Sequence, residues 1–278
     1  MLGALIIVFR EVIEAGLIVG IVLAVTKGLW GSRAMIALGV AAGVAGASLV
    51  AAFAGIIAGA LAGVGQEVFN AAILLLAVAM LTWHNIWMVS HGREIAAEMK
   101  NVGAAVKAGK RTVAALGVVV AVAVMREGSE VALFLYGLVA SANSTSLELL
   151  EGSFIGLGLG AAVTALTYFG LVTIPAKWLF RVTTVLIGFL AAGLAAQAVV
   201  FLQQAGLVDA LSETAWDTSN VLSDSSLFGR VMHTLIGYSD QPSRLQVLVY
   251  LVVLIGGFAL SRAFAPAPHR VARVSPAE

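Results

Sequence analysis

Charged residues inside an apolar segment constrain this chain more than any other feature. The segment Leu2–Val25 is otherwise apolar, but positions 10–14 read Arg-Glu-Val-Ile-Glu. The same spacing, Arg-Glu-x-x-Glu, returns at positions 126–130 within a second apolar segment. A charge near the centre of a bilayer costs about 2.5–3.5 kcal/mol, so packing alone does not explain two such motifs. We interpret them as two halves of one cation site.

The composition is that of a membrane protein. Of the 278 residues, 60% are hydrophobic and 11% are charged, and the mean hydropathy is +1.02. Soluble domains are nearer to about 45–50% apolar and about 25% charged. The chain has no cysteine, which excludes thiolate metal sites, disulfides and cysteine nucleophiles. No cleavable signal peptide is expected, because the first apolar segment continues without a small-residue cleavage site. The chain therefore belongs in a lipid bilayer.

Seven apolar segments have the length of about 20 residues that a membrane-spanning helix needs. They predict an all-α polytopic fold with seven transmembrane helices. The predicted spans are Leu2–Val25, Ala34–Leu61, Val68–Val89, Val113–Ala140, Phe154–Ile174, Val182–Gln203 and Leu245–Ala263. Some glycines are four residues apart, such as Gly39 with Gly43 and Gly156 with Gly160, and this spacing suits close contact between helices in lipid.

The positive charges are concentrated on alternate connections. Twelve of the sixteen Lys and Arg residues lie between the first and second, third and fourth, or fifth and sixth spans, or at the end of the chain. Only Arg230 and Arg244 lie on the opposite side. Because Lys and Arg accumulate in cytoplasmic loops, we predict an N-terminus outside and a C-terminus in the cytoplasm.

The outer connections differ in character. Residues 141–153 are polar and contain neither Lys nor Arg. Residues 205–244 form the longest stretch outside the predicted spans, and the amphipathic pattern at positions 227–236 predicts a short interfacial helix there. The tail, residues 265–278, contains three prolines and is predicted to be disordered.

The two motifs occupy spans that run in opposite directions, the first inward and the fourth outward. We therefore interpret residues 1–112 and 113–204 as two three-helix repeats of inverted topology, followed by an external loop (205–244) and a last span (245–264). Transporters built in this way bind their substrate near the bilayer midplane, at the interface between the repeats.

The charged residues of each motif fall within a narrow stripe, because helix residues three and four apart are neighbours. Four carboxylates and two guanidiniums leave a net charge of −2, which a cation can balance. The candidate metal ligands are Glu11, Glu14, Glu127 and Glu130, with Arg10 and Arg126 in support. Carboxylates suit hard cations such as Mg²⁺, Mn²⁺ or ferric iron, and the absence of Cys and His from both motifs argues against Cu(I) and Zn²⁺.

Other polar residues have two interpretations each. His84, Met88 and His91 share one face of the third span and are candidates for an exit path to the cytoplasm. Alternatively, His91 is interfacial and His84 makes a local hydrogen bond. Glu67 and Asp217 are candidates for guiding cations inward from outside. Alternatively, Glu67 complements a helix dipole and Asp217 forms a cap.

Residues 103–111 are similar to a phosphate-binding loop in part only. Five residues separate its glycines where four are required, and Arg111 stands in place of Ser or Thr. We therefore reject nucleotide binding, and we expect no nucleic-acid partner.

Taken together, these features resemble the iron permeases of the FTR1 family over nearly the whole chain. Besides the two motifs, the likeness includes Gln66–Phe69, Leu81–Trp83, Ala191–Ala195, Trp216–Ser219, Leu235–Tyr238 and Pro242–Ser243. The resemblance implies that the four motif glutamates are needed to transport iron, which is the substrate and not a prosthetic group. It also implies periplasmic partners that bind or oxidise iron. The middle residues of both motifs depart from the family's usual Gly-Leu, and Asn70 stands where some relatives have a further glutamate.

The sequence, together with this resemblance, thus predicts an iron permease of the bacterial inner membrane and not an enzyme. One alternative is a permease for another cation, such as Mn²⁺ or Pb²⁺. A second is a membrane di-metal carboxylate oxidase, although such sites usually use Glu-x-x-His motifs. A third is a proton or sodium channel. The sequence leaves open the oxidation state of the iron, the coupling ion and the formation of a homo-oligomer.

Overall fold

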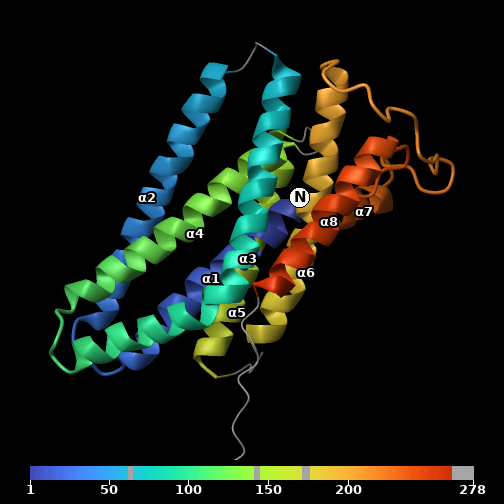
Figure 1. Cartoon of the computed structure of the whole chain (residues 1–278). Coiled ribbons are helices and arrows are strands. Elements are labelled where there is room, and N and C mark those ends of the chain that lie inside the picture. Colours follow the sequence, from blue (N-terminus) through green and yellow to red (C-terminus); the bar gives the residue numbers. More distant parts are fainter. Residues whose placement is uncertain (62–64, 141–144, 171–175, 265–278) are drawn as a thin grey trace, which may run out of the picture.

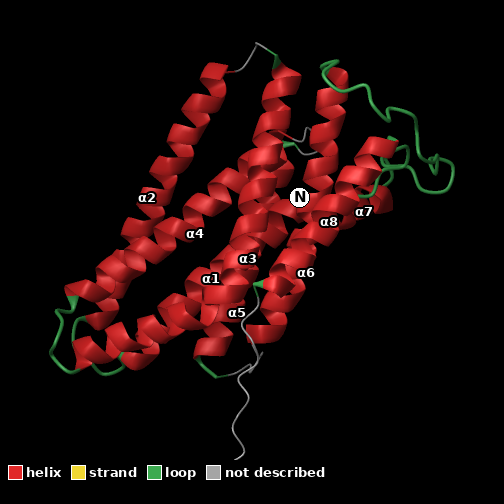
Figure 2. Cartoon of the chain, viewed as in Figure 1, coloured by secondary structure: helices red, strands yellow, loops and turns green. Residues whose placement is uncertain are grey.

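The computed structural model describes residues 1–61, 65–140, 145–170 and 176–264, and these residues form a helical bundle without β-strands (Figure 2). The predicted all-α class is confirmed. The helices follow one another along the chain (Figure 1) as α1 (Leu2–Val25), α2 (Ser32–Leu61), α3 (Gln66–Lys107), α4 (Ala114–Ala140), α5 (Ser146–Tyr168), α6 (Ala176–Gln204), α7 (Leu227–Ile236) and α8 (Arg244–Ala263).

Over its described residues, each predicted apolar segment coincides largely with one helix, and every helix except α7 is accounted for in this way. Within the described parts of the chain, five helices are long and apolar enough to cross a membrane: α2, α3, α5, α6 and α8. In α3 this apolar part is Gln66–Met88. Helices α1 and α4 have the length, but the three charges of each motif interrupt their apolar character. The chain is therefore a multi-pass membrane protein.

Helix α3 does not end near Val89, as the apolar segment predicts, but continues to Lys107 over 42 residues. No proline interrupts it. Its last part is amphipathic, and Met99 and Val102 pack there in a buried cluster with Val22 of α1. The fall in hydropathy near Val89 therefore marks the end of the apolar surface and not the end of the helix.

Helix α5 begins at Ser146 and not at Phe154, so the polar connection before it is shorter than predicted. Thr145 caps the helix, because its side chain accepts a hydrogen bond from the backbone N–H of Glu148. A carboxylate in the first turn also complements the helix dipole. The predicted end of this span and the whole tail after position 264 lie outside the described residues.

The short helix predicted at positions 227–236 is present as α7. Its N-cap, Ser226, accepts a hydrogen bond from the backbone N–H of Gly229. Gly237 ends the helix with a φ of 67°, which favours glycine. A Cβ at Gly237 would lie 2.8 Å from Gly193 of α6 and 2.7 Å from Tyr250 of α8. The end of α7 is thus packed tightly against two helices of the bundle.

The connections lie at two ends of the bundle (Figure 1). The turns after α1 and α3 lie together at the lower left, and the loop from α6 to α7 lies at the upper right. Basic residues such as Lys27 and Lys110 belong to the first of these ends. The arrangement agrees with basic connections that share one side of a membrane.

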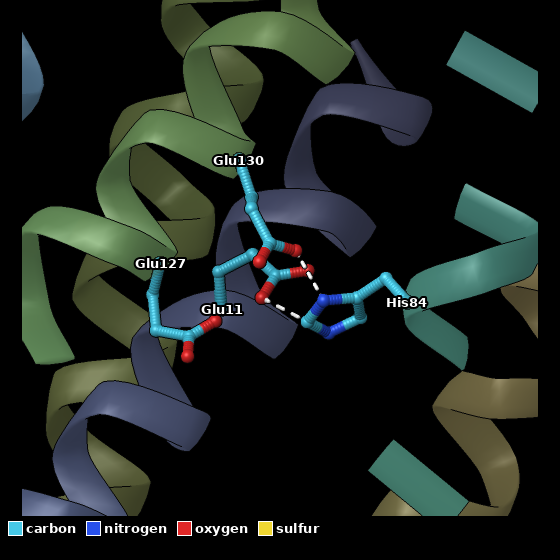
Figure 3. A group of neighbouring side chains, drawn as sticks. All are labelled: Glu11, His84, Glu127 and Glu130. Atoms are coloured by element: carbon cyan, nitrogen blue, oxygen red, sulfur yellow. Dashed lines mark ion pairs between the residues drawn. The ribbon is translucent and has the colours of Figure 1, made fainter. Parts of the chain in front are cut away.

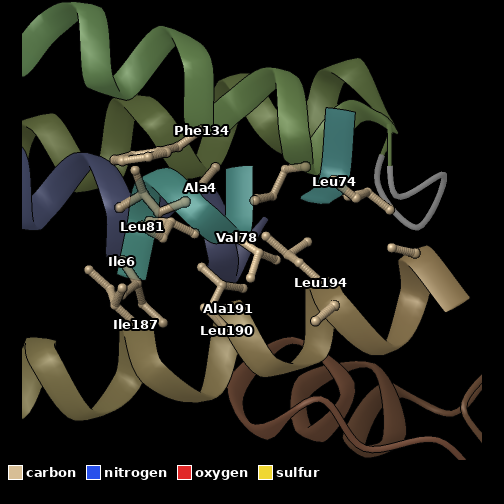
Figure 4. Packing of buried hydrophobic residues seen from close by; sticks show 14 of the residues in the cluster. Ala4, Ile6, Leu74, Val78, Leu81, Phe134, Ile187, Leu190, Ala191 and Leu194 are labelled. Atoms are coloured by element: carbon tan, nitrogen blue, oxygen red, sulfur yellow. The ribbon is translucent and has the colours of Figure 1, made fainter. Parts of the chain in front are cut away.

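Two buried apolar clusters lie on either side of the motifs along the bundle. One joins α1, α3, α4 and α6 and includes Ala4, Leu81 and Phe134 (Figure 4). The other includes Val22 of α1 and Leu116 of α4. The first motif therefore lies between Ala4 and Val22, and the second lies between Leu116 and Phe134. Apolar packing on both sides keeps the charged side chains in the middle of the bundle.

Glycines bring the helices into close contact. A Cβ added to Gly39 of α2 would lie 2.5 Å from the backbone oxygen of Gly117 in α4. A Cβ added to Gly156 of α5 would lie 2.6 Å from the backbone oxygen of Leu5 in α1. No side chain fits at such distances, which confirms the close approach that the glycine spacing predicts.

We expect Gly156→Ala to lower the thermal unfolding temperature of the purified protein in detergent. The added methyl group must push α5 away from the backbone of α1, and overpacking of this kind costs about 1–3 kcal/mol. Gly158→Ala is the matched control, because Gly158 lies on the same helix with open space around it. Equal unfolding temperatures for the two variants would contradict the close packing of α1 and α5.

Candidate metal site

Three helices bring four potential metal ligands together inside the bundle. Glu11 comes from α1, His84 from α3, and Glu127 and Glu130 from α4 (Figure 3). One ligand atom from each residue lies within 4.8 Å of those of the others. We call these four residues the central group. The structure thus brings the two motifs together, as their shared pattern predicts.

Helix geometry explains why the motif carboxylates share one space. Glutamates three residues apart lie on one face of their helix, and α1 packs directly against α4. Glu11 is only 1% exposed and Glu127 only 4%. Met125 precedes the second motif on the opposite face of α4, and this face packs against α2, where the Met125 side chain lies beside Gly46.

Arg10 holds both glutamates of its own motif. Its Nη1 lies 3.0 Å from Oε1 of Glu11, and its Nε lies 3.0 Å from Oε1 of Glu14. All three side chains are buried. Removing one partner of a buried pair is strongly destabilising, because the other charge is left without compensation. Arg10 therefore stabilises the two carboxylates of α1 in the folded state.

Arg126 lies at the edge of the site. Its Nε is 3.3 Å from Oε1 of Glu130 and 4.0 Å from Oε1 of Glu127, but its side chain is 39% exposed. The guanidinium lies 4.0 Å from the centre of the Trp87 ring, a cation–π contact. The Trp87 ring is in turn stacked on His91. The two motif arginines are therefore not equivalent.

The structure places His84 in the site itself. Its ring is buried, and Nε2 lies 3.4 Å from Oε2 of Glu14 and 3.9 Å from Oε2 of Glu11. On the other side of the ring, Nδ1 contacts Oε2 of Glu130. One imidazole thus touches carboxylates of both motifs. The argument against Zn²⁺, which rested on motifs without histidine, therefore does not hold for the assembled site.

Several buried carboxylate oxygens lack a hydrogen-bond donor among the described residues. They include Oε2 of Glu11, Oε2 of Glu14 and Oε2 of Glu127. Leaving a buried polar group unpaired costs about 1–3 kcal/mol, and more when the group is charged. A cation bound between these oxygens would compensate their charge. Carboxylate oxygen combined with imidazole nitrogen is a donor set that suits iron.

The other candidates on α3 lie apart from the central group. Met88 and His91 follow His84 by about 6 and 10 Å along the helix axis. His91 is exposed, and its Nδ1 lies 3.2 Å from the backbone oxygen of Trp87. Glu67 is exposed in the first turn of α3, about 25 Å along the helix from His84.

Asp217 forms a turn in the loop before α7. Its Oδ1 accepts hydrogen bonds from the hydroxyl of Ser219 at 2.6 Å and from its backbone N–H at 3.0 Å. Its Oδ2 accepts a third hydrogen bond from Gln241. The hydroxyl of Ser219 is the main cause that holds the pKa of Asp217 below its ordinary value. The capping interpretation describes this geometry, although the residue caps a turn and not a helix.

Sequence reasoning missed Trp87 and the position of His84. Trp87 lies three residues after His84 and therefore on the same face of α3, which is the one signal that the sequence offered. Helix α3 contributes to the site because of the way it packs against α1 and α4. The spacing of residues within one helix does not show how that helix packs against others.

The fold and the site define a polytopic helical membrane protein with an ionic cluster inside its bundle. The profile of the Iron permease FTR1 family matches residues 1–265, and the chain belongs to this family. It is therefore an iron-transport protein of the membrane, and the predicted resemblance is confirmed.

Individual relatives agree with this assignment. The chain is 32% identical over 272 residues to the ferrous iron permease EfeU of Shigella sonnei, with 97% of each chain covered, and equally similar to that of Escherichia coli O157:H7. A Shigella flexneri protein of the same name is 35% identical over 211 residues, which cover 76% of this chain and 88% of that protein. No solved structure matches the chain.

Proposed function

We propose that this protein carries ferrous iron across the bacterial inner membrane into the cell, through a site formed by its two Arg-Glu-x-x-Glu motifs. The observation that carries the proposal is the buried central group, in which Glu11 of the first motif meets Glu127 and Glu130 of the second. These carboxylates would hold the ion, with Glu14 beside them. The motif arginines would orient the carboxylates and limit their repulsion before an ion binds.

The charge of the site supports Fe²⁺ over Fe³⁺. With all four motif glutamates ionised and the imidazole neutral, the glutamates and the two arginines give a net charge of −2. One Fe²⁺ balances this charge, whereas Fe³⁺ would leave an uncompensated positive charge inside the bundle, where burial is costly. The relatives from Shigella sonnei and Escherichia coli are named as ferrous iron permeases, in agreement with this choice.

We further propose that α1 and α4 also cross the membrane, which gives seven spans arranged as two inverted repeats and a last helix. The packing of the helices supports the repeats. Helix α1 packs mainly against α5, and α4 packs mainly against α2. The first helix of each half thus packs on the second helix of the other half. The two third helices, α3 and α6, also pack on each other.

Contacts between individual residues support this packing of each half on the other. Residues of α4 follow their counterparts in α1 by 116 positions, as Arg126 follows Arg10. A glycine on the second helix of each half faces the backbone of the motif helix in the other half. The residues that these two glycines contact, on α4 and on α1, are themselves 116 positions apart. The corresponding contacts are Gly43 with Ala121 and Met125, and Gly156 with Leu5 and Phe9.

Inverted repeats of this kind suit alternating access, in which one half rocks against the other around a site near the midplane. An inward-negative potential would drive a cation inward by about 2.3 kcal/mol per charge for each 100 mV. We propose that a periplasmic iron-binding or iron-oxidising protein supplies the ion, as the family resemblance implies. Iron is the cargo in this proposal and not a resident cofactor.

Uptake of radioactive iron into proteoliposomes that contain only this chain tests the proposed function. We expect Fe²⁺ to accumulate under an inside-negative potential and Fe³⁺ to remain outside. Uptake of Mn²⁺ or Pb²⁺ in preference to Fe²⁺ would favour the alternative cation permease. A current in the absence of metal would favour the channel. Folded protein that transports no iron would contradict the proposal.

One observation from the structure favours the alternative of a di-metal carboxylate oxidase. His84 adds an imidazole to three carboxylates, and di-metal carboxylate sites combine these ligands. Those sites, however, take a Glu-x-x-His motif from each of two helices, and the central group has a single histidine. Oxidation of Fe²⁺ by the purified protein under oxygen, with many turnovers, would favour the enzyme.

The absence of cysteine allows a sensitive test of the proposed orientation. We expect Asn220→Cys to react with a membrane-impermeant thiol reagent on intact cells, because residue 220 lies in the loop that we place outside. We expect Lys110→Cys to react only after the membrane is opened. Both positions are exposed, and the unmodified chain gives no background. The reverse labelling pattern would overturn the orientation.

A further inference from the structure

We propose that His84 is itself a ligand of the transported cation, and that its imidazole makes the site prefer Fe²⁺ and other borderline divalent cations over harder ones such as Mn²⁺ and Mg²⁺. This inference rests on the proposed function. It adds a metal-binding residue from a third helix to the carboxylates of the two motifs, and it assigns to this residue the choice of metal.

The surroundings of His84 are those of a ligand and not of an ordinary buried histidine. Both ring nitrogens face carboxylates: Nδ1 contacts Glu130, and Nε2 lies 3.4 Å from Glu14. The ring projects from α3 toward the carboxylates of Glu11 and Glu130 (Figure 3). Nε2 is buried and makes no hydrogen bond within the described residues. Nε2, the nitrogen that would bind a cation when the ring is neutral, therefore faces the same space as the unpaired carboxylate oxygens.

The two repeats are not equivalent at this point. Helix α6 is the counterpart of α3 in the second repeat, yet it contributes no residue to the central group. The described site therefore has one imidazole among carboxylates that come in matched pairs from α1 and α4. Carboxylates alone suit Mg²⁺, Ca²⁺ and Mn²⁺, whereas imidazole suits iron, zinc, copper and nickel. The single histidine is thus the group that shifts the metal preference of the site from Mg²⁺, Ca²⁺ and Mn²⁺ toward iron.

Spectroscopy on the intact protein tests ligation directly, with Mn²⁺ alone as the probe. We expect pulsed electron paramagnetic resonance of bound Mn²⁺ to detect coupling to an imidazole nitrogen. The coupling should change when wild-type protein is produced with ¹⁵N-labelled histidine, a comparison that needs no variant. It should disappear in His84→Gln and persist in His91→Gln, the matched control on the same helix. Bound Mn²⁺ without nitrogen coupling would overturn the proposal.

Competition uptake tests selectivity. We expect His84→Gln to lose about 10–100-fold in its preference for Fe²⁺ over Mn²⁺, a range typical of the loss of a group that supports a metal site. If His84 only props the glutamates apart, uptake of both cations will fall by the same factor, and the selectivity proposal fails while the permease stands. If wild-type protein transports no Fe²⁺, the proposed function itself fails.

Discussion

Glu127→Gln is expected to lower Fe²⁺ uptake into proteoliposomes strongly, without loss of the folded protein. Glu127 is 4% exposed, belongs to the central group and lies 4.0 Å from Arg126. The amide keeps the size of the side chain but loses the anionic oxygen that would bind the cation. The site charge falls from −2 to −1, so one Fe²⁺ is no longer balanced. We expect uptake to fall by at least about 10–100-fold.

The folded state of this variant should survive for an electrostatic reason. Neutralising one of several buried carboxylates relieves repulsion between them, whereas Arg126 keeps its shorter contact with Glu130. Glu151→Gln is the matched control, because it makes the same chemical change at an exposed position on α5. Uptake by Glu127→Gln at the rate of the control would contradict the role of the second motif.

Arg10→Met is expected to cause the largest loss of stability among single substitutions in the motifs. Arg10 pairs with Glu11 and Glu14 at 3.0 Å each, and all three side chains are buried. Methionine keeps much of the volume but leaves two carboxylates without a counter-charge. Breaking a buried ion pair costs about 3–5 kcal/mol. The measurement is the unfolding temperature in detergent, together with the yield of monodisperse protein.

Two further variants separate charge from packing. Arg126→Met should be milder, because the Arg126 side chain is 39% exposed and solvent already screens part of its interaction. The double variant Arg10→Met with Glu14→Gln should recover part of the lost stability, since it removes one of the unpaired charges. An Arg10→Met protein as stable as the wild type would mean that the buried ion pairs contribute little.

The sequence was sufficient to predict the helices and the ionic motifs. Long apolar segments have few alternatives to helix in lipid, because every backbone polar group must be satisfied internally. Hydropathy did not show where α3 ends, because its last part is amphipathic and packs through Met99 and Val102. The start of α5 is set by a local cap at Thr145. The capping residue is visible in the sequence, but the polar residues that follow it led to the prediction of a longer loop.

The site could be predicted only in part, for a geometric reason. The spacing of Glu11 and Glu14 within one helix shows that they share a face. The depth at which His84 of α3 meets the motifs depends on the packing of three helices. Gly156 illustrates the limit, because its spacing predicted close contact but not the partner, Leu5 of α1. Relations between helices needed the assembled structure.

Locating iron in the intact protein tests the central claim most directly. A structure of the Fe²⁺-loaded wild-type protein in lipid, with anomalous scattering measured at the iron edge, would place the metal without any assumption about transport. We predict one strong iron peak inside the bundle, between Glu11, Glu127 and His84. Iron found only in the outer loops, for example near Asp217, with none between α1 and α4, would contradict the claim that the two motifs form one cation site.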